Sequence, residues 1–254
     1  MGAVSFACVA GCGKSDASGV APTQVTSAPA AITEPVSAPG FKAGTYAVYG
    51  VKSDDVLNVR AEPDASSKKV YSFGPTVKGV RTTGRSLVRG DTPWAEVVFE
   101  GGTGWVNRLF LTEVMPGGGC NDPNLTAAIR KLMRVVESTD PAGLRDVVSP
   151  LRGLSVRGDV ASQPVHFAWD GVDGVFTSPV AITVKGASEK CGKVVLGAGA
   201  NGGWPAEYAA VTPVSFDYPG TTGADWYTWI AGFEYVDDRP YVAALIRYQR
   251  GSAP

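Results

Sequence analysis

Val56-Leu57-Asn58-Val59-Arg60-Ala61-Glu62-Pro63 has the pattern of a short strand that ends in a turn. Leu57 and Val59 alternate with polar residues, and Pro63 fixes φ in the loop that follows. A second strand is expected in Gly101-Gly102-Thr103-Gly104-Trp105-Val106, where glycine lets the backbone approach closely beside the bulky tryptophan. Several short apolar segments separated by turns lie between the two stretches, which is typical of a small β-barrel.

Residues 44–115 resemble a bacterial SH3-like domain. The resemblance rests on Leu57-Asn58-Val59-Arg60 with Pro63, on Trp94 at the start of the middle strand, and on Gly104-Trp105-Val106 followed by Leu109-Phe110-Leu111. It implies a small barrel that acts as a binding module.

Related modules in wall-active proteins bind peptidoglycan stems or other peptides in a groove lined by aromatic side chains. The candidates for such a groove in this chain are Tyr49, Tyr71, Trp94 and Trp105. Core packing is the alternative role for the two tryptophans, and the tyrosines are also ordinary strand residues.

Val9-Ala10-Gly11-Cys12 resembles a lipobox, which predicts a lipoprotein signal remnant over residues 1–12 with Cys12 as the lipidated residue. The apolar run before it carries no Lys or Arg and is shorter than a complete signal peptide, so an ordinary apolar N-terminus is the alternative. Residues 13–43 contain few large apolar side chains and are expected to be a disordered tether.

Residues 120–250 are predicted to form an α+β domain. Asp122-Pro123 and Asp140-Pro141 are helix-start signals, and β-like segments follow them to the end of the chain. The expected fold class is therefore an all-β SH3-like small barrel followed by an α+β domain, in which two N-terminal helices precede an antiparallel curved sheet. This region also resembles the uncharacterised C-terminal region of some bacterial lipoproteins that carry SH3-like modules, a resemblance that implies no activity.

The four cysteines fall into an N-terminal pair, Cys8 and Cys12, and a distant pair, Cys120 and Cys191. In an exported protein the distant pair is free to form a disulfide. A reactive or metal-binding thiol is the alternative, but the chain has one histidine and no Cys-x-x-Cys spacing.

The sequence offers no recognisable catalytic constellation. His166 is the only histidine, which argues against a zinc hydrolase, and the flanks of Cys120 and Cys191 do not fit the usual cysteine nucleophiles. We therefore expect no enzymatic activity, no cofactor and no metal. Two alternatives stay open: a carboxylate pair among Glu189, Glu207, Asp217, Asp225 and Glu234, and a small-ligand pocket lined by Trp169, Trp204, Trp226, Tyr227 and Trp229.

The net charge of −1 gives no reason to expect a nucleic-acid partner. The combined expectation is a lipid-anchored, extracytoplasmic protein of the cell envelope that binds or scaffolds without catalysis. Its expected partners are peptidoglycan or an envelope peptide or protein, together with the membrane through the N-terminal lipid. A role in cell-wall turnover, accessory or catalytic, is the alternative.

Overall fold

A computed structural model gives the fold of this protein, and all of the described residues belong to one compact unit. The predicted signal remnant with Cys12, and the tether as far as residue 40, lie outside the described residues. The structure describes residues 41–114, 119–158, 162–178, 182, 188–192, 204–218 and 227–249.

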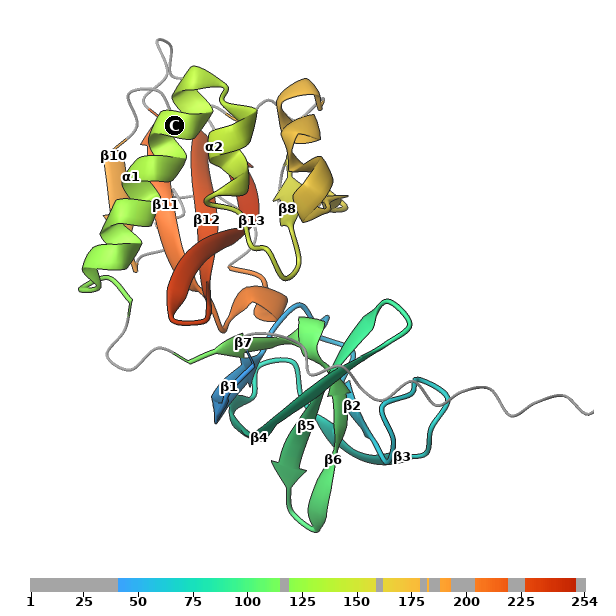
Figure 1. The fold of residues 1–254 in the computed structure, drawn as a ribbon. Coiled ribbons are helices and arrows are strands. Elements are labelled where there is room, and N and C mark those ends of the chain that lie inside the picture. Colours follow the sequence, from blue (N-terminus) through green and yellow to red (C-terminus); the bar gives the residue numbers. More distant parts are fainter. Residues whose placement is uncertain are drawn as a thin grey trace, which may run out of the picture. The chain divides into compact units, whose positions relative to one another are not determined.

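The first half of the described chain forms a seven-stranded sheet in which all neighbouring strands are antiparallel (Figure 1). The sheet ends at β3 and β7, and no ladder joins these two strands among the described residues. In spatial order the strands are β3 (Lys69–Phe73), β2 (Leu57–Arg60), β6 (Gly102–Asn107), β5 (Thr92–Phe99), β4 (Lys78–Arg89), β1 (Ala43–Val48) and β7 (Leu111–Glu113).

The strands of this sheet share one apolar core. Leu57 is 4% exposed and Val59 is fully buried, so the alternation in β2 turns these side chains inward as the sequence predicts. Gly104 on β6 is required by this packing, because a Cβ atom there would lie 2.6 Å from Cγ1 of Val59. The other buried members of the core come from nearly every strand: Tyr46, Val48, Val51, Val80, Ala95, Val97, Val106 and Leu111.

The described part of the second half contains two α-helices and a six-stranded sheet. Helix α1 (Pro123–Ser138) begins at the predicted signal, since the Asp122 side chain accepts a hydrogen bond from the Asn124 amide, and α2 (Pro141–Arg145) begins in the same way after Asp140. No described helix is long and apolar enough to cross a membrane. In spatial order the strands are β10 (Ser188–Cys191), β11 (Thr212–Tyr218), β12 (Tyr227–Val236), β13 (Arg239–Gln249), β8 (Leu154–Arg157) and β9 (Val165–Phe167).

Both faces of the second sheet are covered. On one face α1 and α2 lie across the strands (Figure 1), where Leu125 and Leu132 pack in the same core as Trp229 and Phe233 of β12. The opposite face carries a separate cluster that includes Ile230, Ile246, Tyr208 and, from the first half of the chain, Tyr49. Burial on both sides accounts for the nearly continuous apolar run along β12.

The fold class expected from the sequence is wrong. The chain is mostly β, with two sheets, and its α-helices lie in the middle of the chain. The second sheet is mixed and not antiparallel, because β8 runs parallel to β13, with Ala244 opposite Ser155 and Ile246 opposite Arg157. Local alternation predicts that a segment is a strand, but the direction of its partner depends on long-range packing.

Contacts join the first sheet to the second. The Arg152 guanidinium, in the loop between α2 and β8, donates hydrogen bonds to the Leu109 and Leu111 carbonyls at the end of the first sheet. The Gly50 amide donates to the Glu207 carbonyl at 2.7 Å, beside the short 3₁₀ helix η3 (Ala206–Tyr208). These contacts join the two regions predicted as separate domains, residues 44–115 and 120–250, so the two sheets are held together by more than the connecting chain.

The predicted disulfide between Cys120 and Cys191 is confirmed, with the two Cα atoms 5.7 Å apart. It fastens the segment before α1 to β10 at the edge of the second sheet. Gly192 follows with φ of +73°, and a Cβ atom there would lie 2.9 Å from Sγ of Cys120, so this position favours glycine for both reasons.

Candidate functional site

A cavity of about 500 Å³ opens on the first sheet, around the quoted strand β2. Its wall combines residues of the loop after β1 with strands β2, β5 and β6 and the 3₁₀ helix η1 (Arg108–Phe110). The lining residues are Gly50, Val51, Lys52, Asp55, Val56, Leu57, Asn58, Arg60, Ala65, Thr92, Trp94, Asn107 and Phe110.

Two aromatic rings and two amides give this cavity its chemistry. Trp94 is 6% exposed and Phe110 packs partly against the core, so both rings are held in place by their surroundings. The Asn107 side chain accepts a hydrogen bond from the Leu109 amide at 2.9 Å, which fixes its orientation. Asn58 Oδ1 is buried and has no hydrogen-bond partner among the described residues. An apolar wall with a few oriented polar groups is typical of a ligand site.

The charged residues of the lining are Lys52, Arg60 and Asp55, which leaves an excess of one positive charge. Arg60 Nη1 donates to the Ser67 carbonyl at 2.9 Å, so the guanidinium is held at the rim by the turn that follows β2. A peptide with a carboxylate would find a cation beside an aromatic wall in this cavity.

The structure does not bring the four predicted groove residues together, since only Trp94 lines the cavity. Tyr71 on β3 is 38% exposed and stacks on Phe99, with 5.0 Å between ring centroids. Trp105 on β6 is 8% exposed, and the Arg85 guanidinium lies 5.4 Å from its ring centroid.

Tyr49 is buried between the two sheets. It is 4% exposed, its ring centroid lies 5.5 Å from that of Tyr208, and the Arg152 guanidinium lies 4.3 Å from its ring centroid. Burial raises the pKa of Tyr49 well above its ordinary value, although the positive charge of Arg152 acts in the opposite direction. Its surroundings indicate a packing role.

Sequence reasoning missed Lys52, Asn107 and Phe110 as members of this cavity. Phe110 belongs to the motif Leu109-Phe110-Leu111, and Asn107 is a favourable cap residue directly before η1, so both residues had a local sequence signal. Nothing in the local sequence indicated that the loop after β1 would meet η1.

The single histidine forms one side-chain contact that resembles part of a catalytic pair. Nδ1 of His166 lies 3.3 Å from Oγ of Ser155, its cross-strand neighbour on β8. Both groups lie at the exposed edge of the second sheet, and no described carboxylate contacts the imidazole, so the third group that would orient a base is missing from the described residues. Within the same residues, no group of three or more His, Cys, Asp or Glu side chains is placed to hold a metal ion.

The aromatic residues predicted to line one pocket in the second half do not lie together in a single pocket. Trp229 is fully buried in the core, and Trp204 and Tyr227 pack partly buried against two different clusters. Trp169 is 43% exposed and lines another cavity, whereas Trp226 lies outside the described residues.

The chain matches no family model, and no matching curated protein or solved structure was found. The likeness of residues 44–115 to bacterial SH3-like domains therefore stays a prediction from their motifs.

Proposed function

We propose that this protein is a non-catalytic binding protein of the cell envelope that docks a carboxylate-bearing peptide in the cavity around β2. The observation that carries the proposal is the combination, in one cavity, of a rigid wall formed by Trp94 and Phe110 with the cations Lys52 and Arg60. Aromatic surface supplies the buried apolar contact and a guanidinium supplies bidentate recognition of a carboxylate.

The peptide stems of peptidoglycan fit this chemistry, because they carry carboxylates on a short chain. An acidic segment of another envelope protein has the same features. The resemblance of residues 44–115 to SH3-like modules favours the peptidoglycan stem among these partners.

The disulfide supports a location outside the cytoplasm, since structural disulfides persist in oxidising compartments. Together with the lipobox-like Val9-Ala10-Gly11-Cys12, it favours a protein anchored to the membrane through a lipid on Cys12. In this proposal the docking cavity is tethered to the membrane and holds the protein against the wall.

The test is a sedimentation assay of the full chain with insoluble peptidoglycan. Arg60→Gln and Lys52→Gln should each weaken retention about tenfold, which corresponds to the loss of one charge-assisted hydrogen bond. Arg81→Gln is the matched control, because Arg81 is exposed on β4 and does not line the cavity. Retention that is equal for all three variants would reject the cavity as the docking site.

Tyr71→Ala separates this cavity from the groove predicted from sequence. Tyr71 does not line the cavity, so its removal should leave retention unchanged. Loss of retention with Tyr71→Ala alone would place docking on the exposed Tyr71 ring, which stacks on the partly buried Phe99. Mass spectrometry of wall fragments incubated with the protein should reveal no newly formed chain ends. New ends would show that the protein hydrolyses the wall and would contradict a purely binding role.

A further inference from the structure

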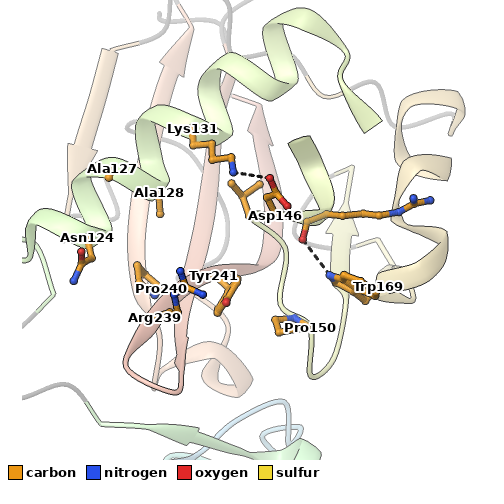
Figure 2. A pocket seen from close by; sticks show the side chains of 12 residues that line it. Asn124, Ala127, Ala128, Lys131, Asp146, Pro150, Trp169, Arg239, Pro240 and Tyr241 are labelled. Atoms are coloured by element: carbon orange, nitrogen blue, oxygen red, sulfur yellow. Dashed lines mark hydrogen bonds and ion pairs between the residues drawn. The ribbon is translucent and has the colours of Figure 1, made fainter. Parts of the chain in front are cut away.

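A second cavity, of about 640 Å³, lies between the helices and the β12–β13 hairpin of the second half (Figure 2). It shares no residue with the cavity around β2, so the inference drawn from it is independent of the proposed function. Its lining residues are Asn124, Ala127, Ala128, Lys131, Arg145, Asp146, Val147, Pro150, Trp169, Arg239, Pro240 and Tyr241.

Trp169 is an exposed aromatic side chain with a fixed orientation. Its Nε1 donates a hydrogen bond to the Arg145 carbonyl at 3.0 Å, which satisfies an orphan carbonyl at the end of α2. This hydrogen bond satisfies the indole N–H, while the residue as a whole stays 43% exposed and lines the cavity. A tryptophan whose polar end is satisfied and whose apolar surface is open is typical of a ligand-contacting residue.

The cations of the lining differ in their partners. Lys131 is paired with Asp146 at 2.8 Å, and Arg145 is paired with Asp173 at 3.1 Å. Arg239 forms no ion pair with any of the described residues, and it is exposed at the start of β13. The lining therefore offers one guanidinium with its donors available for an anion.

Asp237 and Asp238 form the two-residue turn of the β12–β13 hairpin, directly before Arg239. Asp237 and Asp238 have φ of +53° and +61°. The Glu113 carboxylate accepts hydrogen bonds from both of their amides, at 2.9 and 3.0 Å, and thereby stabilises the turn. Arg239 is the first residue after this turn, so the same hydrogen bonds fix the backbone from which its side chain projects.

We propose that this cavity binds an acidic oligosaccharide, with a sugar ring on the Trp169 indole and a carboxylate of the ligand on the Arg239 guanidinium. The C–H face of a sugar ring is apolar and flat enough to pack on indole. Its hydroxyl groups match the polar part of the lining, such as the Asn124 amide, and a uronic-acid carboxylate matches the fork of an arginine. The small side chains of Ala127 and Ala128 leave room between α1 and the hairpin.

A peptide bound by strand addition is disfavoured at this site because the backbone around it is already paired. Pro240 and Tyr241 pair with Tyr235 and Glu234 of β12. The Val242 amide donates to the Val147 carbonyl at 2.8 Å, and the Val242 carbonyl accepts from the Ser149 amide at 3.0 Å. A ligand must therefore be recognised through side chains, which suits a saccharide better than an extended peptide.

Isothermal titration calorimetry of the full chain with a hyaluronan tetrasaccharide tests the proposal. Chitotetraose, a neutral saccharide, and triglutamate, an acidic peptide, are the comparison ligands. The hyaluronan fragment should bind saturably, and chitotetraose at least tenfold more weakly. Arg239→Gln should lower hyaluronan binding to the level of chitotetraose, whereas Trp169→Ala should abolish binding of both saccharides. Arg81→Gln is the matched charge control and should bind like the parent protein.

Trp169→Phe keeps an aromatic face without the indole N–H, so it should fold and bind the saccharide with reduced affinity. Equal thermal unfolding midpoints for Arg239→Gln and the parent protein would show that the effect on binding does not arise from misfolding. Absence of saturable hyaluronan binding, unchanged binding by Arg239→Gln, or equally tight binding of triglutamate would each overturn the proposal.

Discussion

Arg152 and Glu234 form an ion pair that is buried where the two sheets meet, with side chains 8% and 0% exposed. Nε of Arg152 lies 2.8 Å from both carboxylate oxygens, and the same guanidinium donates to the Leu109 and Leu111 carbonyls of the first sheet. Burial lowers the pKa of Arg152, but the charge and hydrogen bonds of Glu234 outweigh burial, so the pKa lies above its ordinary value. One cation thus joins the loop before β8, strand β12 and the end of the first sheet.

Loss of the Glu234 carboxylate should be costly because it leaves a buried cation without a counter-charge. We expect Glu234→Gln to lower the free energy of unfolding by about 3 kcal/mol, the usual result of removing one partner of a buried ion pair. Denaturation by guanidinium chloride, followed by circular dichroism, measures this change.

Asp146→Asn is the matched control, since it removes the acidic partner of the exposed Lys131–Asp146 pair. Exposed pairs contribute little, and this variant should lose no more than about 1 kcal/mol. Equal losses for Glu234→Gln and Asp146→Asn would contradict the role assigned to the buried pair.

Reduction of the Cys120–Cys191 disulfide should also destabilise the fold. The cysteines are 71 residues apart, and a loop of this length predicts a loss of about 4 kcal/mol on the chain-entropy account. A Cys120→Ala, Cys191→Ala double variant should have its unfolding midpoint at a correspondingly lower denaturant concentration. Alkylation of the denatured, unreduced protein followed by peptide mass mapping should leave both cysteines unmodified, and labelling of either would contradict the disulfide.

The sequence predicted local features better than the partners of each strand. The inward positions of Leu57 and Val59 and the helix starts at Asp122 and Asp140 follow from alternation and capping, which depend on nearby residues. The parallel pairing of β8 with β13 joins Ser155 to Ala244 and depends on the packing of the whole second sheet. No local pattern reports that pairing.

The candidate sites show the same division. Aromatic side chains in strands suggested a groove, but Tyr49 packs between the sheets while Tyr71 stays exposed on β3. The local sequence does not distinguish these two tyrosines. Tyr49 is buried because residues of the second sheet pack against it, whereas no such described element covers Tyr71. The sequence pattern groups Trp169 with four other aromatic residues in one pocket, whereas its neighbours in the cavity come from α1, the end of α2 and the hairpin turn.

Gly153 should tolerate no side chain. Its φ is +72°, and a Cβ atom would overlap the Phe167 carbonyl oxygen on β9. Gly153→Ala is expected to lose more than about 3 kcal/mol of stability, because the backbone clash adds to the cost of the left-handed conformation. Gly79→Ala is the control: its φ is +92° but nothing lies within 4 Å of a Cβ there. That variant should lose about 1 kcal/mol from conformation alone. If chemical denaturation gave the two variants equal losses of unfolding free energy, the close approach of the Phe167 carbonyl to Gly153 would not contribute to the cost of the substitution.

Tyr248 makes stability sensitive to alkaline pH. Burial raises its pKa to about 12, with Arg157 lowering it and Glu207 raising it further. A tyrosine in the unfolded chain ionises near pH 10, so between about pH 10 and about pH 12 the folded state binds more protons and stability falls as pH rises. Below that range both states keep the proton and the contribution is fully present. Tyr248→Phe should therefore show a shallower loss of unfolding free energy across this range than the parent protein. In a spectrophotometric pH titration of the folded protein, the variant should show one tyrosine fewer ionising near pH 12 than the parent protein. Identical alkaline profiles for the two proteins would show that Tyr248 ionises as it does in the unfolded chain.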